Sequence, residues 1–481
     1  MTKQPKVRKP HPILHGIGLV LSVILLVAVL VGTYFLSTMA TIIDSFFGAP
    51  SGHYSDAEIA DTKVKAEALA AEVEAEGTVL VQNNDNTLPL SADTKKVNVF
   101  GWASTAWLGG GSGSGAASSG TDSTAGTAFK LGGTGPLTGG ASIYGLAAQR
   151  GAQIAVDEIN AQGGAIQFDL KYEDDQHDPE KAVNAYNALK EWGMQISLGS
   201  VTSQPGISTS ALNQEDGIFA LTPSASSPDV IAGKDNVYQM CFSDPNQGLA
   251  SAQYIAEQQL GEKIFIIWKS DDNYSTGIKD KFMAEAEKLG LNVVGNATFT
   301  TDSQNDFNVQ LTQAKQDDAD LLFLPIYYEP ASLILSQAKA MGYAPKFFGV
   351  DGMDGILTMK NFDPALAEGV MLLTPFNADD EDEATQNFVK KYQEQYGETP
   401  IQFAADAYDC VYAYKLALET AGCTPDMSAA ELNAKMKETF PTITFTGLTG
   451  DGAGITWDAT GAVSKSPKGM VIQNGAYVGM D

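Results

Sequence analysis

The chain has 481 residues, of which 44% are apolar and 18% are charged, and its 58 acidic and 30 basic side chains give a formal charge of −28. This composition predicts a folded protein with more than one hydrophobic core. So much negative charge would repel a phosphate backbone, which excludes nucleic acid as a partner. Three cysteines are too few for a disulfide framework, so we expect Cys241, Cys410 and Cys423 to be buried free thiols.

The first element is an apolar segment behind a basic N-terminus. Four of the first nine residues are Lys or Arg, and the uncharged stretch that follows, residues 10–43, has its apolar centre at Leu19 to Leu36. About 20 apolar residues span a bilayer as a helix, whereas a cleaved signal has a core of about 7 to 15. Residues 1–44 are therefore predicted to be a cytoplasmic basic tail and a transmembrane helix, with the rest outside the cytoplasm. The alternative is a cleaved signal peptide.

A small unit follows at residues 55–108, with a helix expected over 57–76 and strands at 78–82 and 96–100. Fewer than about 60 residues bury too little surface to be stable alone. The turn NTLPL and its surroundings, within residues 57–112, resemble a fragment of family 3 glycoside hydrolases. That family needs a nucleophile and a separate acid/base carboxylate, and the chain continues into something else before supplying them. We expect no glycosidase activity.

The stretch 109–128 consists almost wholly of Gly, Ser, Ala and Thr, which predicts a flexible linker. From Phe129 onward, short apolar runs alternate with helical patterns. The runs begin at 129, 168, 196, 218, 264, 291 and 321, and helices are expected over 144–160, over 179–192, after Pro245 and over 276–289. This order predicts an α/β fold with parallel sheets covered on both faces. About 350 residues exceed one core, so we expect two lobes with a ligand site at the carboxyl ends of their strands.

The opening of this unit, KLGGTGPLTGGASIYGLAAQRGAQIAVDEINAQGG at 130–164, resembles the leucine/isoleucine/valine-binding family of type I periplasmic binding proteins. The motifs GSVTSQP, LTPSASSP, DDNYSTG, PIYYEP and FGVDG follow in the same order, so the resemblance covers 129–481. It implies a two-lobed clamp with three hinge crossovers. The hinges are expected near Cys241–Gln247, Thr374–Asn377 and Thr444–Gly450, with lobe one at about 129–244 and 376–445 and lobe two at about 245–375 and 446–481.

One side of the expected site carries hydroxyls. Ser200, Thr202 and Ser203 lie between a strand end and a predicted helix start, where hydroxyls and free amides can bind a carboxylate. The resemblance assigns the ligand carboxylate to Ser200 and Ser226, and the ligand ammonium to the backbone carbonyl of Ser224. The alternative is that the first three only cap the helix.

The other side carries an acid and aromatic rings. Asp351 matches the acidic residue that faces the ammonium in the family, although glutamate is common there; it could instead be a turn residue. Tyr144, Tyr274 and Tyr327 match segments that line the cleft, with core packing as the alternative for Tyr327. Four further residues are expected to have no binding role: Trp192, Trp268 and Tyr328 as packing residues and Asp175 as a solvated loop residue.

The single histidine of the large unit, His177, rules out a His cluster for zinc, and we find no nucleophile motif, so we expect neither an enzyme nor a metal or cofactor. The resemblance implies capture of an amino acid with an aliphatic side chain, such as a branched-chain one, for an ABC importer. Its partners would be the permease and ATPase subunits, and the protein would act as a monomer tethered to the cell membrane by one helix. The alternatives are a ligand-sensing receptor ectodomain and an active glycosidase remnant.

Overall fold

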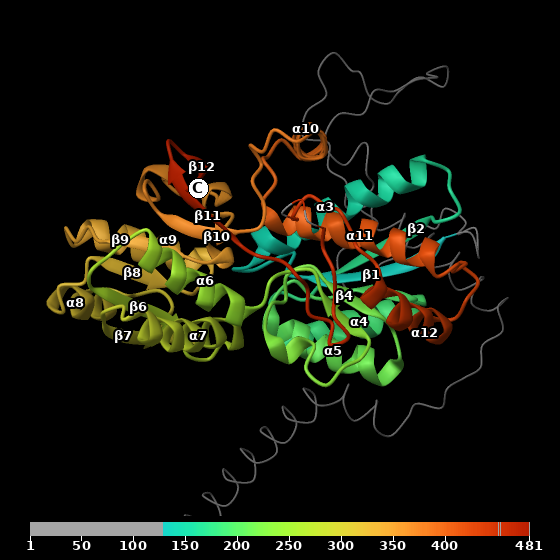
Figure 1. Ribbon diagram of the computed structural model, residues 1–481, viewed down its shortest axis with the longest axis horizontal. Helices are drawn as coiled ribbons and strands as arrows, with labels where there is room; N and C mark the ends of the chain where they lie inside the picture. The colour runs from blue at the N-terminus through green and yellow to red at the C-terminus, as the bar shows by residue number, and fades with distance from the viewer. Residues whose placement is uncertain (1–127, 451, 453, 481) are drawn as a thin grey trace, which may run out of the picture. The chain divides into compact units, whose positions relative to one another are not determined.

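The computed structural model describes residues 128–450, 452 and 454–480 (Figure 1). The predicted transmembrane helix, the fragment at 55–108 and the linker up to residue 127 lie outside these residues. Between residues 128 and 480, none of the described helices combines the length and the apolar character needed to cross a membrane.

The first sheet has five parallel strands in the order β2-β1-β3-β4-β5. Its strands are β1 (Phe129–Gly135), β2 (Phe168–Asp174), β3 (Ile196–Leu198), β4 (Ala220–Thr222) and β5 (Val237–Gln239). The connecting helices are α3 (Ser142–Ala161), α4 (Pro179–Trp192) and α5 (Ser203–Asp216). Figure 1 shows α3 on one side of this sheet and α4 and α5 on the other.

The second sheet has seven strands in the order β12-β11-β10-β9-β8-β6-β7. Its strands are β6 (Ile264–Lys269), β7 (Val293–Phe299), β8 (Leu321–Leu324), β9 (Lys346–Gly349), β10 (Met371–Thr374), β11 (Lys468–Gln473) and β12 (Ala476–Gly479). The helices α6 (Asp244–Glu257) and α7 (Asn273–Leu289) pack together, as do α8 (Asn308–Gln316) and α9 (Tyr328–Ala340). Only β11 and β12 run antiparallel to their neighbours.

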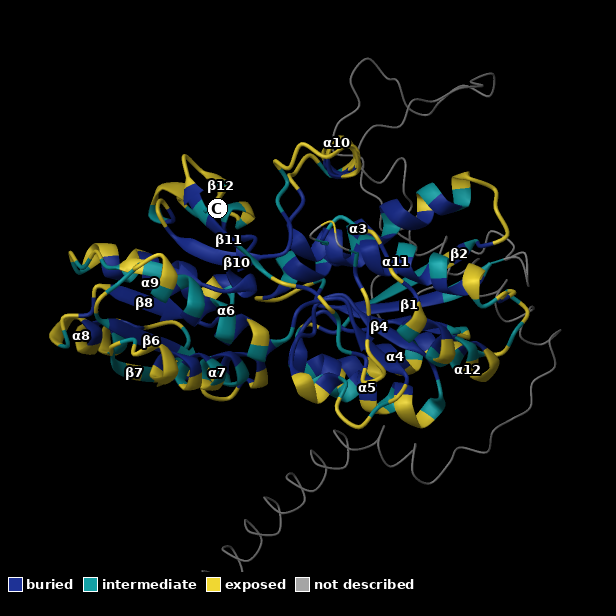
Figure 2. Cartoon of the chain, viewed as in Figure 1, coloured by how far each residue is buried: buried dark blue, intermediate teal, exposed yellow. Residues whose placement is uncertain are grey.

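Three C-terminal helices return to the first lobe. They are α10 (Glu383–Tyr396), α11 (Gln402–Thr420) and α12 (Ala429–Thr439). Both α10 and α11 pack on α3, and α11 lies beside it in Figure 1. The two-lobed α/β fold is therefore confirmed, with helices covering both faces of buried strands (Figure 2).

Local sequence explains where the helices begin and end, as α4 illustrates. The Asp178 side chain accepts hydrogen bonds from the N–H groups of Glu180 and Lys181, which caps the first turn. Pro179 occupies the first helical position, where its missing N–H costs nothing. Gly193 ends the helix at φ +92°, a left-handed conformation that glycine adopts without strain.

The chain passes between the sheets three times. The first passage lies between β5 and α6, and the second between β10 and α10. The third was expected at Thr444–Gly450, but the structure places it later. Trp457 still donates its indole N–H to Gln239 O at 2.7 Å, and Gly461 O accepts from Gln239 N at 3.0 Å. These bonds hold the segment against β5 until the chain enters the second sheet at Lys468.

Candidate ligand-binding site

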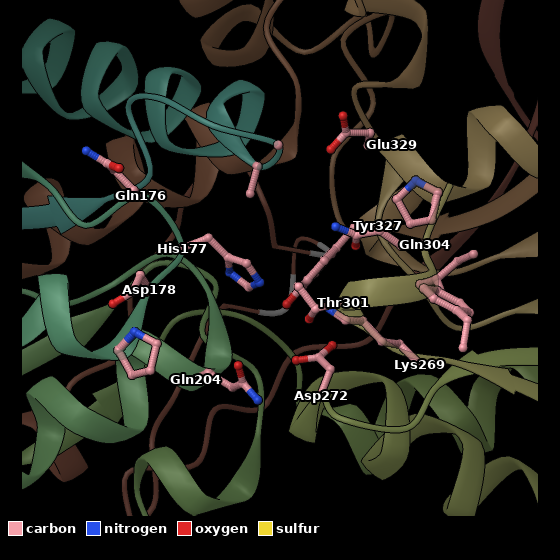
Figure 3. Close-up of a pocket in the computed structure, with 16 residues that line it drawn as sticks. Gln176, His177, Asp178, Gln204, Lys269, Asp272, Thr301, Gln304, Tyr327 and Glu329 are labelled. Carbon is pink, nitrogen blue, oxygen red and sulfur yellow. The ribbon is translucent and has the colours of Figure 1, made fainter. Parts of the chain in front are cut away.

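A cavity of about 300 Å³ opens between the two lobes. The residues in its wall lie at the last position of a strand or in the loops and helix starts that follow, because the strands of both sheets end toward this cleft. Its volume lies at the lower end of the range of about 300 to 1,000 Å³ found for ligand pockets. The labelled wall residues in Figure 3 are Gln176, His177, Asp178, Gln204, Lys269, Asp272, Thr301, Gln304, Tyr327 and Glu329.

Direct hydrogen bonds join the lobes around this cavity. The Tyr144 hydroxyl, on α3, donates to Gly352 O and accepts from Tyr328 N at 3.1 Å. Gln204 Nε2 donates to Asp271 O at 2.8 Å on the opposite side of the cleft. The lobes are therefore in a closed arrangement, and Tyr328, expected only to pack, takes part in holding it.

Asp351 does not line this cavity; it lies at the start of the turn after β9, and it is 4% exposed. The Tyr274 hydroxyl donates to Asp351 Oδ1, and the backbone N–H of Asp351 donates to Gln247 Oε1 at 3.2 Å. Burial raises the pKa of this carboxyl to about 7, although the Tyr274 hydrogen bond acts in the opposite direction. A carboxyl held in this way would bind a cation strongly, since a positive partner would offset its lost hydration.

Tyr327 connects this inner acid to the cavity. Its ring stacks on Tyr274 at a centroid distance of 4.7 Å and meets Tyr144 edge-on at 5.6 Å. Burial raises the pKa of its phenol well above the usual range, and Asp272, Tyr144, Asp244 and Asp351 all add to this effect, so the ring lies among these groups. The three predicted tyrosines therefore meet at one place, and Tyr327 also lines the cavity.

Most of the five predicted hydroxyl side chains already form hydrogen bonds to other protein groups. Ser200 donates to Asp175 Oδ2 at 2.6 Å, and Ser224 donates to Val201 O. Thr202 pairs with His177 Nδ1 at 2.9 Å, while Ser203 accepts from Ser227 N at 3.2 Å. Among the described residues, the Ser226 hydroxyl alone of these five makes no hydrogen bond of good geometry. It lies beside Asp244, whose pKa it lowers, so it can donate either to that carboxyl or to a ligand.

The start of α5 is also open. Thr202 is the N-cap residue, yet no side chain makes a cap hydrogen bond there. The first N–H groups of a helix have no partner within the helix, and they attract an anion. The hydroxyls at 200–203 therefore do not cap this helix, and its first turn is available to a carboxylate.

Sequence reasoning missed Asp244, the first residue of α6. It is completely buried, and neither of its carboxylate oxygens has a partner among the described residues. Burial raises its pKa well above the usual range, and the charges of Asp351 and Asp272 act in the same direction, whereas the neighbouring Ser226 hydroxyl acts against them. An Asp-Pro pair before a helical pattern signalled only a helix start, so nothing in the local sequence marked this acid as a binding residue.

Asp175 was predicted to be a solvated loop residue, and the structure shows that this prediction was wrong. The side chain is completely buried and bonds to the Ser200 hydroxyl and to the backbone N–H of His177 at 2.9 Å. Burial raises its pKa to about 6. The strand β2 ends at Asp174, so the next side chain turns inward rather than continuing the alternation expected for an extended loop.

The described part of the chain contains no cluster of three or more His, Cys, Asp or Glu side chains arranged to hold a metal ion. All three cysteines are buried and free, as predicted.

Comparison with known proteins agrees with this geometry. A family model described as periplasmic binding protein matches residues 128–465. The chain belongs to the periplasmic binding protein family. A Leu/Ile/Val-binding protein of Rhizobium johnstonii, BraC3, is 29% identical over 324 residues, which cover 66% of this chain and 86% of that protein. The Leu/Ile/Val-binding protein of Escherichia coli K12 is 28% identical over 256 residues, which cover 52% of this chain and 68% of that protein.

Solved structures show the same fold. The leucine-binding protein LivK of Thermotoga maritima superposes with a TM-score of 0.66 at 26% identity, covering 73% of this chain and 98% of that one. The branched-chain amino acid transporter substrate-binding protein LivJ of Streptococcus pneumoniae, solved with isoleucine, gives 0.65 at 27% identity, covering 73% and 97%.

Proposed function

We propose that the protein captures a free α-amino acid between its two lobes, outside the cytoplasm, and delivers it to an ABC importer. The observation that carries this proposal is the pairing of unused groups across the cleft. Two buried acids, Asp351 and Asp244, are the acceptors, and the open start of α5 and the Ser226 hydroxyl, which lies beside Asp244, are the donors. Acceptors on one side and donors on the other are what a zwitterion requires.

The energetics favour such a ligand. Burying an unpaired charge costs several kcal/mol, roughly, even after relaxation. Here burial and the mutual repulsion of Asp351, Asp244 and Asp272 raise the pKa of Asp244. A bound ammonium would relieve that repulsion, while the first turn of α5 would hold the carboxylate. The zwitterion contacts are the same for every α-amino acid, so the side-chain class is a separate question.

The names of the relatives support this ligand class and the transport role. They are binding proteins for leucine, isoleucine and valine or parts of branched-chain amino acid transporters. In our proposal the site residues are Tyr144, Ser200, Thr202, Ser203, Ser224, Ser226, Tyr274, Tyr327 and Asp351, together with Asp244. The partners are the permease and ATPase subunits, and the protein binds its ligand without catalysis.

We further propose that the protein works as a monomer tethered to the membrane by the apolar segment at 19–36. Membranes washed at alkaline pH should retain the chain, and deletion of residues 1–44 should release it. Recovery of the full chain in the soluble fraction would contradict the tether.

The ligand is tested by titration calorimetry of the purified protein with the twenty common amino acids. We expect at least one to bind with a Kd in the micromolar range or tighter. A folded protein that binds none of them would overturn the proposed function.

A further inference from the structure

Lys269 lies in the cavity wall with an unused charge. It is the last residue of β6 and is 9% exposed. Its backbone N–H bonds to Ser275 Oγ at 2.8 Å, but its ammonium makes no hydrogen bond or ion pair within residues 128–480. Figure 3 shows the side chain reaching from the second lobe toward the middle of the cavity. A buried ammonium without a partner is costly, so the position of this one in a cavity wall points to a ligand group.

Asp272 faces the same cavity from the start of α7. Its Oδ2 accepts from Ser275 N at 3.3 Å, which caps the helix. Its Oδ1 has no partner among the described residues, although the side chain is 3% exposed. No ion pair or hydrogen bond joins Asp272 to Lys269 among the described residues, although the charge of Lys269 opposes the burial that raises the pKa of Asp272 to about 6; a donor and an acceptor therefore both remain open in one wall.

Two acids of the wall, Asp178 and Glu329, make no ion pair with Lys269 among the described residues: Asp178 Oδ1 caps α4, and Glu329 is exposed. His177 lies opposite in Figure 3, and its ring meets Tyr327 edge-on at 5.4 Å. Burial, and after it the charge of Lys269, lowers the pKa of His177 to about 4, so the ring is neutral at pH 7. Gln204 contributes only a neutral amide from the facing wall, and so does Gln304 from the second lobe. An aliphatic side chain entering this space would leave Lys269 and Asp272 desolvated and unpaired.

One chemical group meets both demands. A primary carboxamide offers a carbonyl oxygen to the Lys269 ammonium and an N–H to Asp272 Oδ1, without changing the net charge of the site. A carboxylate would satisfy Lys269 but would place a second negative charge beside an Asp272 oxygen that still lacks a donor. Tyr327 lies between the two regions, because it lines the cavity and its ring stacks on Tyr274, so the ligand must extend past this ring to reach both.

We propose that the preferred ligand is an amino acid with a carboxamide side chain, of the glutamine type, held at its far end by Lys269 and Asp272. This assignment rests on the proposed function, because it takes the zwitterion site as given. It departs from the aliphatic side chain that the sequence resemblance implied.

The test compares L-glutamine, L-glutamate and L-leucine in titrations of the full-length wild-type protein at pH 7.5. We expect glutamine to bind at least tenfold more tightly than either of the others. Leucine binding as tightly as glutamine would overturn the carboxamide assignment and leave the amino-acid function intact. Glutamate binding more tightly would overturn it in favour of an anionic side chain. Binding of no amino acid would remove the proposed function itself.

Substitutions in the cavity wall test whether Lys269 and Asp272 are the side chains that set the preference for glutamine. Lys269→Met keeps the length and apolar stem of the side chain but removes the ammonium, and it should weaken glutamine at least tenfold while leaving leucine unchanged or tighter. Asp272→Asn is a second, independent test. It keeps the size of the side chain but removes its charge, and it should also weaken glutamine binding. Lys360→Met, at an exposed position outside the cavity, is the matched control and should change neither ligand. An unchanged ratio of glutamine to leucine affinity in both cavity variants would refute the inference.

Discussion

Replacing Asp351 by Asn should separate ligand binding from stability. The amide has the size of the carboxylate and still offers Oδ1 to the Tyr274 hydroxyl, but it carries no charge. Removing one partner of a buried charge pair costs about 2 to 5 kcal/mol. Because Asp244 remains beside the ammonium, we expect the lower end, about 2 kcal/mol or roughly a 30-fold loss of affinity.

The same substitution should weaken ligand binding but stabilise the folded, ligand-free protein at alkaline pH. Burial raises the pKa of Asp351 from its ordinary value of 3.8 to about 7. Since the folded value exceeds the unfolded one, the protonated carboxyl stabilises the fold fully below pH 3.8, and this contribution disappears as the pH rises through 7. At pH 8 the ionised group therefore destabilises the free protein by on the order of 4 kcal/mol at most.

The assay is calorimetry at pH 8, with ligand titrations for affinity and thermal scans for stability. Asp351→Asn should bind about 30-fold more weakly, roughly 2 kcal/mol, while unfolding at the same temperature as the wild type or higher. Asp169→Asn, on the exposed side of β2, is the control and should change neither. Wild-type affinity in the Asn variant would refute the role of Asp351 at the ammonium. A fall in melting temperature would refute the account of its burial.

Three further results are expected. Affinity should fall as the pH drops below 7, by at most about tenfold per pH unit, because a protonated Asp351 must release its proton before it can pair with an ammonium; a constant Kd between pH 5.5 and 8 would contradict this. Tyr144→Phe removes the hydroxyl that bonds to Gly352 and Tyr328, so stopped-flow measurements should show ligand release faster by several-fold, for about 1 kcal/mol. Lys465→Met removes the partner of Asp406 Oδ1 at 2.7 Å and leaves a buried acid unpaired, which should cost about 3 to 5 kcal/mol in thermal or urea unfolding. The matched variant Lys437→Met removes the exposed ion pair with Asp235 and should lower the free energy of unfolding by at most about 1 kcal/mol. Equal losses in the two variants would show that burial does not make the Lys465–Asp406 pair more important.

The fold followed from the sequence because strand and helix periodicities are local. Runs such as IFIIW and LLFL became the buried strands β6 and β8, and predicted helix ends agreed to within a few residues where Gly193 or Gly290 stops the helix. The third crossover was misplaced because the bonds that delay it, from Gln239 to Trp457 and Gly461, join residues more than two hundred positions apart.

The binding site was only partly predictable for a related reason. Motif order pointed to Asp351 and the tyrosines, which the fold brings together. It could not show that Ser200 is already bonded to Asp175, or that Asp244 is buried without a partner, since both facts depend on packing between segments. The sequence shows that residue 269 is a lysine, but only the structure shows that it lines a cavity and that no described neighbour pairs with its ammonium.

In the proposed complex the cleft holds both ends of a zwitterion. The most direct measurement compares the best-binding amino acid with its N-acetyl derivative and its α-carboxamide in titrations of the same protein. Acetylation removes the ammonium that Asp351 and Asp244 would hold, and amidation removes the carboxylate at the start of α5. We predict that each change weakens binding at least 30-fold, roughly 2 kcal/mol. Derivatives that bind as tightly as the parent amino acid would contradict the account.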